Sequence, residues 1–410
     1  MRPAEGAGPR SCPGAASSDA LPEPPAQAAQ ASRELVARIT DAIDRAGGWI
    51  GFDRYMALAL YEPRLGYYAS GSRKFGAEGD FVTAPELSPL FGQCVAAQCA
   101  HWFGSVRPRI VEFGAGSGAL AAELLASLDA LGEAPERYEI VEVSASLRER
   151  QRELLSRRVP ALLGRVSWLD ALAPRIEGVV VANEVLDAMP VRLFRWSDGA
   201  VHERGVACAP AGGFAFADRP ADEAFAARVR RTVEQAWGEG AAPRGDYVSE
   251  IGEQAAGWVA TVAERLARGA MLLFDYGFPR AEYYHPHRST GTLQCHYRHR
   301  VHADPFLWPG LQDVTAHVDF TAVAGAARDA GLATLGFSSQ ARFLLDCGLL
   351  DRLAALPRGD AREWAKQVQA AQMLLSEAEM GELFKAIAFG RDVPDDAPGF
   401  VTRDRRAVLE

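Results

Sequence analysis

The sequence of 410 residues predicts an α/β fold built on one mainly parallel β-sheet with helices on both faces. Two observations lead to this prediction. From residue 109 onward, short apolar runs alternate with segments of helical spacing, which is the pattern of doubly wound sheets. In addition, "RIVEFGAGSGALAAELL" (109–125) passes from an apolar run through a glycine turn into a helical pattern. Such a turn binds a cofactor at the carboxyl edge of a parallel sheet.

Two segments precede the first strand of this sheet. Residues 1–30 are rich in Ala, Pro and Gly and lack the apolar core of a signal peptide, so we expect a disordered tail. Residues 31–108 are expected to form an N-terminal helical region that includes a loop dense in Gly and Pro before the first strand. The spacing in "SRELVARITDAIDRAGG" predicts one helix, and Ser88 followed by Pro89 predicts the start of another.

The alternating part of the chain is expected to form the main domain, residues 109–395. Its strands are expected at 109–113, 138–142, 165–169, 178–182, 269–277, 332–337 and 383–391. Its helices are expected at 118–131, 145–157, near 221–237 and near 252–267. Insertions are expected at about 190–245, which begins with β-rich sequence, and at about 338–380, which is mostly helical. Residues 396–410 are expected to be a C-terminal tail.

Composition argues against several classes of protein. The formal net charge is −9, which disfavours non-specific binding to nucleic acid or anionic lipid. The six cysteines include no C-x-x-C pair, so we expect reduced thiols rather than a disulfide framework. No run of 18 apolar residues is present, so no transmembrane helix is expected. These features predict a cytoplasmic protein.

The glycine turn itself fits two cofactors. Gly114, Gly116 and Ala119 match the G-x-G-x-x-[GA] pattern of a dinucleotide site. Gly114, Gly116 and Gly118 equally match the G-x-G-x-G turn of an S-adenosylmethionine site. In both cases the glycines let the backbone approach the ligand closely, and a helix starts beside it. The turn alone therefore leaves the cofactor open.

Polar side chains near the turn favour S-adenosylmethionine. Glu112 lies two residues before the first glycine, where its carboxylate can face the methionine amino group, whereas a dinucleotide strand is usually apolar there. Glu142, at the end of the next strand, can hold ribose hydroxyls of either cofactor. The apolar strand at 178–182 is followed by Asn183, Glu184 and Asp187, at the sheet edge where ligands bind. The alternative is that this last cluster only caps a helix.

Six blocks of the sequence resemble the MidA-type methyltransferases, in the same order along the chain. They are "LGYYASGSRKFGAEGDFVTAPELSPLFGQ", "VEFGAGSGAL", "IVEVSASLRERQ", "VANEVLDAMPVRLF", "LLFDYG" and "QDVTAHVDF", and the resemblance runs from about Gly51 to Gly390. It implies a Rossmann-like class I methyltransferase fold: a seven-stranded, mainly parallel sheet with an antiparallel last strand, plus helical and β-rich insertions. It also implies S-adenosyl-L-methionine as donor and S-adenosyl-L-homocysteine as product. In the mitochondrial members, the acceptor is an arginine on a core subunit of respiratory complex I, which is symmetrically dimethylated.

The resemblance also implies which residues bind the cofactor. In the family the segment around "GDFVTAPE" folds over the cofactor, so we interpret it as a lid rather than a plain connecting loop. The expected cofactor-binding residues are Asp80, Phe81, Thr83, Glu112, Gly114, Gly116, Gly118, Glu142, Val143, Asn183 and Glu184.

An arginine acceptor needs negative charge around it. The guanidinium stays protonated, with a pKa above about 12, so the site must orient it with carboxylates and offset two positive charges brought together. The expected catalytic residues are Glu184, Asp187, Asp275 and His317. Loops can also bring Asp80 and Asp319 to the site. Which acid contacts the acceptor stays open at this point, and any of these acids can instead cap a helix.

A histidine-rich loop follows the "DYG" strand. Six of the eight histidines lie between His285 and His317, with Cys295 among them, which is a density that suggests zinc. Only one cysteine is present, however, and no H-x-x-x-H helix or C-x-x-C pair frames the loop. We therefore expect no metal and interpret the loop as part of the acceptor pocket.

The sequence therefore predicts a protein arginine N-methyltransferase that uses S-adenosylmethionine and acts on a complex I-type subunit. Alternatives are a methyltransferase acting on a small molecule or RNA, a non-catalytic assembly factor of the same fold, and an NAD(P) oxidoreductase. The intact glycine turn, Glu112 and Glu142 argue against the non-catalytic alternative. The expected partners are a protein substrate and, as a candidate, a second copy of the chain; neither nucleic acid nor stable membrane insertion is expected.

Overall fold

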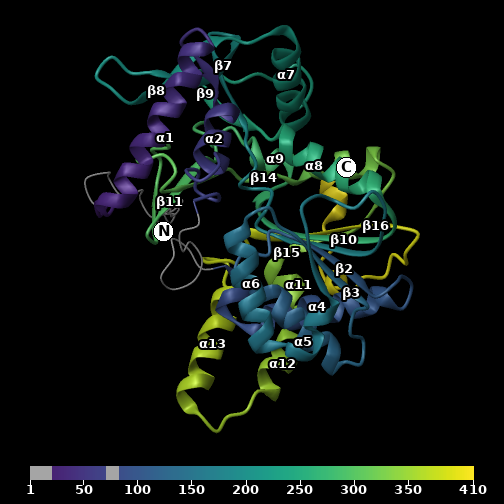
Figure 1. Ribbon diagram of the computed structural model, residues 1–410. Helices are drawn as coiled ribbons and strands as arrows, with labels where there is room; N and C mark the ends of the chain where they lie inside the picture. Colours follow the sequence, from purple (N-terminus) through teal and green to yellow (C-terminus); the bar gives the residue numbers. More distant parts are fainter. Residues whose placement is uncertain (1–20, 71–82) are drawn as a thin grey trace, which may run out of the picture.

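A β-sheet of seven strands, extended by one very short strand, lies at the centre of the described part of the chain (Figure 1). The computed structural model describes residues 21–70 and 83–410, so the expected cofactor-covering residues Asp80 and Phe81 lie outside the described residues. The spatial order is β4-β3-β2-β5-β10-β16-β15. The bounds are β2 (Arg109–Phe113), β3 (Arg137–Val141), β4 (Val166–Leu169), β5 (Ile176–Asn183), β10 (Leu266–Phe278), β15 (Ala333–Ser339) and β16 (Phe384–Arg391).

The directions of these strands confirm the predicted fold class. β4, β3, β2, β5 and β10 pair in parallel. β16, the last strand of the chain, runs antiparallel to both β10 and β15. The short strand β14 (Val318–Asp319) pairs in parallel with the carboxyl end of β10 and was not expected from the sequence. The sheet is thus Rossmann-like, mainly parallel, with an antiparallel last strand.

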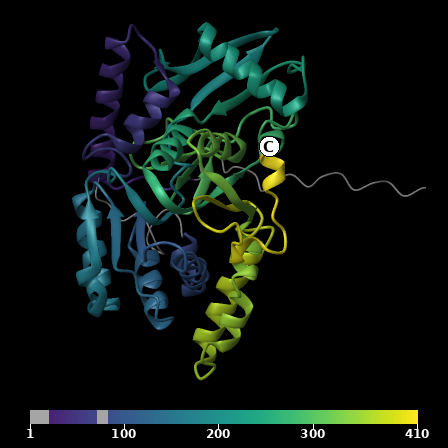
Figure 2. The ribbon, with the colours of Figure 1, turned by 90° about the vertical axis from the view of Figure 1, so that its right-hand side faces the viewer.

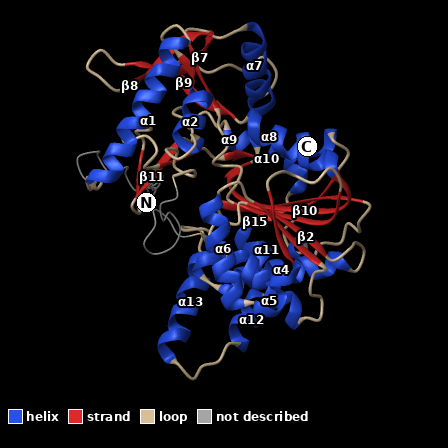
Figure 3. Ribbon diagram, in the orientation of Figure 1, coloured by secondary structure: helices blue, strands red, loops and turns tan. Residues whose placement is uncertain are grey.

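Helices cover both faces of the sheet because the side chains of its buried strands alternate between two cores. In β5, Val179 and Val181 belong to one core, and Val180 and Ala182 belong to the other. Figure 3 shows the helices in blue on either side of the red strands. The first core contains residues of α4 (Pro89–Phe103), α5 (Ala119–Ala130) and α6 (Ala145–Arg158), and the second contains residues of α8 (Glu253–Arg265) and α10 (Phe320–Asp329).

The predicted start of α4 is confirmed in detail. Ser88 is its N-cap, and the Ser88 hydroxyl accepts a hydrogen bond from the Leu90 N–H at 3.2 Å. Pro89 occupies the first helical position, where no N–H donor is needed. The short helix α3 (Ala84–Leu87) lies directly before it.

A second sheet and two N-terminal helices form the upper part of the molecule in Figure 1. The sheet consists of β1 (Ile50–Gly51), β6 (Arg192–Ser197), β7 (Ala200–Cys208), β8 (Phe214–Pro220) and β9 (Tyr247–Ile251). One of its faces packs on α1 (Ala26–Arg45) and α2 (Phe52–Tyr61), and the other packs on α7 (Glu223–Trp237). The insertion expected at about 190–245 is therefore this sheet with α7, but β9 lies just beyond the expected end.

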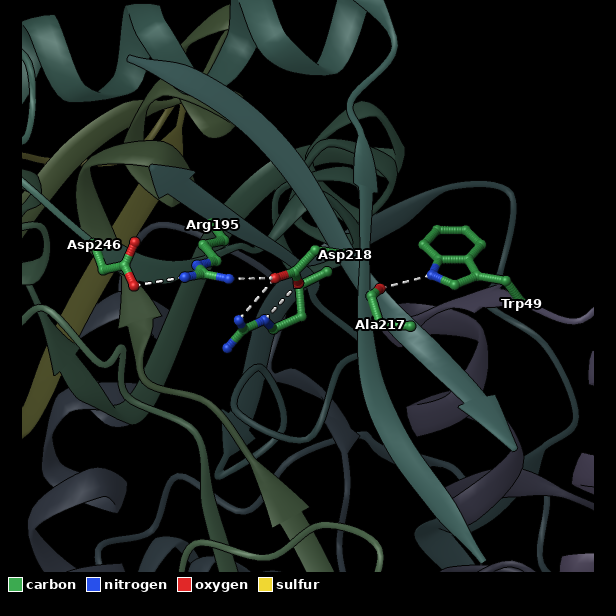
Figure 4. A network of polar contacts seen from close by, with 6 residues as sticks. Trp49, Arg195, Ala217, Asp218 and Asp246 are labelled. Atoms are coloured by element: carbon green, nitrogen blue, oxygen red, sulfur yellow. Dashed lines mark hydrogen bonds and ion pairs between the residues drawn. The ribbon is translucent and has the colours of Figure 1, made fainter. Parts of the chain in front are cut away.

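Ion pairs link β6, β7 and β8 of the second sheet to one another and to the loop before β9 (Figure 4). The Arg195 guanidinium lies 3.1 Å from the Asp218 carboxylate and 2.6 Å from that of Asp246. Arg204 on β7 donates to the same Asp218 on β8 at 2.8 Å. The Trp49 indole N–H donates to the Ala217 carbonyl at 2.8 Å. These contacts attach the segment before β1 to β8 and the loop before β9 to β6.

A third, small sheet continues from the carboxyl end of β10. It contains β11 (Gln294–Tyr297), β12 (Arg300–His302) and β13 (Asp313–Thr315), and the short helix α9 (Arg280–Tyr283) precedes it. The expected helical insertion contains α11 (Gln340–Asp346), α12 (Leu349–Ala355) and α13 (Ala361–Leu375). Figures 1 and 2 show α12 and α13 projecting from the body of the protein on the side of α4 and α5.

Two of the expected boundaries differ from the structure. α1 begins at Ala26, so the end of the expected tail is helical, and Leu21 is already buried. The expected C-terminal tail also packs on the core: Phe400 contacts the ring of Phe343, and Leu409 is buried in the second core. Segments of this kind are hard to predict, because they are rich in Ala or in charged residues overall. A few apolar residues are nevertheless enough to attach them to the core. Within the described ranges, no helix has the length and apolar character needed to cross a bilayer.

Candidate functional site

A cavity of about 980 Å³ lies at the carboxyl ends of the central strands. This volume is at the upper end of the range of about 300–1,000 Å³ typical of small-molecule sites. Of the residues expected at a cofactor site, those that line the cavity are Thr83, Glu112, Gly114, Gly116, Glu142, Val143, Asn183 and Glu184. Of the expected catalytic residues, Glu184 and Asp187 line it, whereas Asp275 and His317 do not.

The glycine turn between β2 and α5 forms one wall of the cavity. Gly114 has a φ of 65° and Gly118 has a φ of 87°, in the left-handed region that favours glycine. A Cβ atom on Gly114 would lie 2.5 Å from the Val185 side chain. Gly118 lies behind the wall and serves as the N-cap position of α5 rather than lining the cavity. The glycines therefore allow both the turn and its close approach to the neighbouring loop.

Glu142 is fixed at the end of β3 by its neighbours. The Ser144 N–H donates to Glu142 Oε1 at 2.8 Å, and Gln151 Nε2 donates to Glu142 Oε2 at 3.4 Å. Gln151 also donates to the Gly116 carbonyl at 3.0 Å and accepts from the Trp168 indole at 2.8 Å. Gln151 thus connects Glu142 to the glycine turn. The sequence did not indicate this role, although Gln151 ends one of the quoted family blocks.

Glu112 lies almost fully buried in the floor of the cavity, with 1% of its surface exposed. The Tyr138 hydroxyl donates to Glu112 Oε2 at 2.8 Å. Burial raises the pKa of Glu112 to about 8, although the hydrogen bond from Tyr138 opposes this shift. A buried carboxyl group of this kind is well suited to a cationic ligand, which would favour its ionised form.

The loop after β5 holds two further acids at the cavity. Glu184 has a φ of 55°, which is unusual for a residue other than glycine, and its N–H donates to the Phe274 carbonyl at 2.8 Å. Asn183 Nδ2 donates to Glu184 Oε1 at 2.8 Å. Burial and the nearby Asp187 raise the pKa of Glu184 to about 8. Within the described ranges, Asp187 Oδ1 and Asn183 Oδ1 are buried without a hydrogen-bond partner.

Asp275 holds this loop in place. Its Oδ2 atom accepts hydrogen bonds from the backbone N–H groups of Val185, Leu186 and Asp187, at 3.1, 2.8 and 3.3 Å. Because these donors occupy the oxygen and the side chain does not line the cavity, Asp275 is a positioning residue. The sequence placed it correctly at the strand end, but its carboxylate faces the backbone of the neighbouring loop.

His317 and Asp319 also face away from the cavity. The His317 ring stacks on Phe278, with ring centroids 5.3 Å apart and an interplanar angle of 9°. Burial lowers the pKa of His317 to about 3, so the imidazole is neutral at physiological pH. Asp319 caps α10, accepting from the N–H groups of Thr321 and Ala322, and pairs with Arg280. This is the helix-cap alternative that the sequence left open.

The cavity lining includes residues that the sequence did not indicate, among them Tyr61, Tyr68, Tyr276 and Asp313. A signal was present for three of these four, because Tyr276, Tyr68 and Asp313 each lie within a quoted family block. Tyr68 and Asp313 contact each other. Their meeting depends on how the N-terminal segment packs on the third sheet, which no local pattern predicts. Asp313 is buried, and its Oδ2 accepts from the Tyr68 hydroxyl at 2.7 Å.

The histidine-rich loop supplies two residues, Gln294 and His296, to the lining of the cavity. His296 on β11 lines the cavity, while its neighbour Cys295 is fully buried in the core beneath the second sheet. His285 and His287 are exposed and contact each other, with ring centroids 5.0 Å apart. In residues 21–70 and 83–410, no three His, Cys, Asp or Glu side chains are close enough to hold one metal ion.

We expect the histidine-rich loop to bind no structural metal, because its cysteine is buried in an apolar core and, among the described residues, no three potential ligands lie together. Elemental analysis of protein purified without an affinity tag should find well under one equivalent of zinc. Protein with His285 and His287 both changed to Ala is the control for adventitious surface binding. Stoichiometric zinc that resists dialysis and remains in this double variant would contradict the expectation.

Comparison with known proteins identifies the family. A family model described as "Putative S-adenosyl-L-methionine-dependent methyltransferase" matches residues 94–338, more than half of the chain. The mitochondrial protein arginine methyltransferase NDUFAF7 of Danio rerio is 29% identical over 368 residues, covering 83% of each chain. Its homolog in Drosophila melanogaster is 30% identical over 372 residues, covering 83% of this chain and 81% of that protein. The human protein is 27% identical over 371 residues, covering 83% and 80%.

A solved structure is similar over nearly the whole chain. It is a COG1565 superfamily protein from Burkholderia thailandensis bound to S-adenosyl-homocysteine, with 50% identity and a TM-score of 0.90, covering 95% of this chain and 100% of that one. The native structure of a protein of the same superfamily and organism has 49% identity and a TM-score of 0.87. The predicted cofactor, S-adenosylmethionine, is thereby confirmed. The chain belongs to this family of S-adenosyl-L-methionine-dependent methyltransferases.

Proposed function

We propose that the protein is a protein arginine N-methyltransferase that acts on a core subunit of a complex I-type respiratory enzyme. The observation that best supports an arginine acceptor is that two neighbouring acids, Glu184 and Asp187, line the cavity, and that Asp187 Oδ1 is buried without a hydrogen-bond partner in the described ranges. Like charges gathered away from water are costly unless a cation offsets them. A guanidinium group is such a cation, and the NDUFAF7 relatives are named protein arginine methyltransferases.

The lining of the cavity fits S-adenosylmethionine. We assign the ribose hydroxyls to Glu142 and the methionine amino group to Glu112. Val143, which is 81% exposed at the end of β3, offers an apolar surface to the adenine ring. The unpartnered Asn183 Oδ1 offers a buried acceptor to a donor group of the ligand. Thr83, at the start of α3, lies on the side from which the cofactor would be covered.

The protein's own residues would orient the acceptor and offset its charge. When bound, S-adenosylmethionine supplies a methyl group whose bond to the sulfonium sulfur breaks as a bond to an acceptor nitrogen forms, the electron pair staying on sulfur and one proton leaving the nitrogen. We assign Asp187 and Glu184 to the guanidinium, because both line the cavity and attract a cation. Asp275 supports them by fixing the backbone of residues 185–187.

Replacing Glu142 by Ala is expected to weaken S-adenosylmethionine binding by about 1–3 kcal/mol, the usual cost of losing hydrogen bonds to a charged group. Isothermal titration calorimetry should show this loss together with an unchanged melting temperature. Glu149→Ala, which removes an exposed glutamate of α6, is the matched control and should bind like the wild type. An unchanged affinity of Glu142→Ala for S-adenosylmethionine would contradict the assignment of the ribose hydroxyls to Glu142.

The acceptor can be tested directly by mass spectrometry. The complex I core subunit should carry a dimethyl-arginine in the wild-type strain and lack it in a strain without this gene. Restoring the gene should restore the modification, whereas restoring an Asp187→Asn form should not. If the subunit is unmodified in the wild type, or equally modified in the deletion strain, the proposed substrate is wrong.

A further inference from the structure

The cavity extends beyond the glycine turn to a wall made by two distant parts of the chain. Tyr61 at the end of α2 and Tyr68 in the following turn form one side. Asp313 at the start of β13 and Asp187 in the loop after β5 form the other. The cavity of about 980 Å³ is large enough to hold a second group beside a cofactor. These four residues are candidates to contact that second group.

The two tyrosine rings are stacked and held in place. Their centroids are 5.6 Å apart and their planes differ by 20°. The Tyr61 hydroxyl donates to the Ala188 carbonyl at 2.9 Å, and the Tyr68 hydroxyl donates to Asp313 Oδ2 at 2.7 Å. Because both hydroxyl groups form hydrogen bonds, the orientation of the two rings in the cavity wall is fixed. Tyr61 is 43% exposed, which places it at the rim of the cavity.

The two aspartates lie close to this aromatic pair. Burial raises the pKa of both tyrosines, and the charges of Asp313 and Asp187 raise it further. Asp313 is 3% exposed, and its Oδ1 accepts from the Val314 N–H at 3.0 Å. Asp187 Oδ1 is buried and has no hydrogen-bond partner within the described ranges. A ligand with N–H donors and positive charge would supply what this oxygen lacks.

Flat aromatic faces beside buried carboxylates favour one class of cation. A guanidinium is planar, stacks on aromatic rings and donates several N–H bonds in a fixed fork. A lysine ammonium is compact and strongly hydrated, and it gains less from a flat wall. A neutral group of the same shape, such as a urea, would stack equally well but would bring no positive charge to Asp187.

We propose that Tyr61, Tyr68 and Asp313, together with Asp187, form the subsite that selects a guanidinium-bearing acceptor. Tyr61 and Tyr68 supply the flat wall, Asp313 holds Tyr68 and adds negative charge, and Asp187 accepts the N–H donors. This inference rests on the proposed function, because it names the residues that would recognise an arginine. It adds specificity-determining residues on α2 and β13 that the sequence did not assign.

The test uses three probes that occupy both parts of the cavity. Each is an S-adenosyl-homocysteine analogue with a short alkyl arm on nitrogen in place of sulfur, ending in a guanidine, a urea or a primary amine. The wild-type chain should bind the guanidine probe about tenfold or more tighter than the urea and amine probes, as expected for charge-assisted bonds plus stacking. Calorimetry measures the three dissociation constants without requiring catalysis.

Variants then show which residues produce the preference for the guanidine probe. Tyr61→Leu and Asp313→Asn should abolish most of the preference for guanidine, while the affinity for S-adenosyl-homocysteine stays within about twofold. Tyr61→Phe keeps the ring and is the matched control, which should retain the preference. Tyr68→Phe removes only the hydroxyl, so it provides a milder variant should Asp313→Asn not fold.

The outcomes separate this inference from the proposed function. Loss of the guanidine preference in Tyr61→Leu and in Asp313→Asn or Tyr68→Phe supports the subsite. A wild-type preference that survives in these variants overturns the subsite and leaves the arginine acceptor standing. A wild-type chain that binds the three probes equally, or prefers the amine, overturns the arginine acceptor and the subsite with it.

Discussion

Asp187→Asn is expected to lower the rate of methyl transfer about 10²–10³-fold, while folding and S-adenosyl-homocysteine binding stay close to the wild type. The reason is that Asp187 faces the cavity, where its Oδ1 has no partner among the described residues. The neutral amide removes the negative charge that Asp187 places beside the acceptor. The loop stays anchored, because Asp275 still accepts hydrogen bonds from its backbone. The interaction lost is one that matters most as charge and orientation develop in the transition state. Glu184→Gln should behave similarly, with some loss of cofactor affinity as well.

Single-turnover kinetics on the identified acceptor, with calorimetry and thermal melting on the same samples, checks this result. Asp351→Asn, an exposed aspartate on α12, is the control and should have wild-type activity. Full activity in both Asp187→Asn and Glu184→Gln would rule out a carboxylate clamp. A large fall in melting temperature for Asp187→Asn would instead indicate a structural role.

The affinity for S-adenosylmethionine is expected to rise with pH between pH 6 and pH 8. Burial raises the pKa of both Glu112 and Glu184 to about 8, so both carboxyl groups are largely protonated below this pH. A cationic ligand binds the ionised form, so binding below pH 8 releases a proton. Each such carboxyl group that contacts the cationic ligand lowers the dissociation constant by up to about tenfold for each pH unit. The rise in affinity levels off above pH 8, where the carboxyl groups are already ionised.

Calorimetry at several pH values, in buffers of different ionisation enthalpy, measures both the affinity and the protons released. Glu112→Gln should reduce the slope, because the titrating carboxyl group assigned to the methionine amino group is gone. Glu379→Gln removes an exposed carboxylate from the rim of the same cavity and should leave the slope unchanged. An affinity that is flat, or that falls, between pH 6 and pH 8 would contradict the assignment of Glu112 to the methionine amino group.

The central sheet could be predicted from sequence because its signals are local. The expected strand at 109–113 is β2 to the residue, and the helix after the glycine turn begins one residue from its expected start. Apolar runs, a glycine turn and an N-cap serine each act within a few residues. The packing of residues 396–410 on the core could not be predicted for the opposite reason, since Phe400 and Leu409 pack on partners far away in the chain.

For the candidate site, the sequence could predict only which residues lie at the ends of neighbouring strands. The sequence placed Glu184, Asp187 and Asp275 at one edge, but the direction of each side chain depends on tertiary packing. Asp275 turns to the loop backbone, while Asp187 faces the cavity. Tyr61 and Asp313 were missed because neither has a local signature of binding. The cytoplasmic location and the homodimer stay predictions.

The hydrogen bond between Tyr68 and Asp313 joins residues 245 positions apart in the sequence. The segment with Tyr61 and Tyr68 therefore leaves the ribosome long before the strand that it must meet has been made. β16, which lies between β10 and β15, is translated later still. Non-local pairings of this kind form slowly and leave apolar surface open to aggregation in the meantime. A nascent chain would thus acquire its glycine turn early but its acceptor side only near the end of synthesis, and the first helices made would be among the last elements to reach their final neighbours.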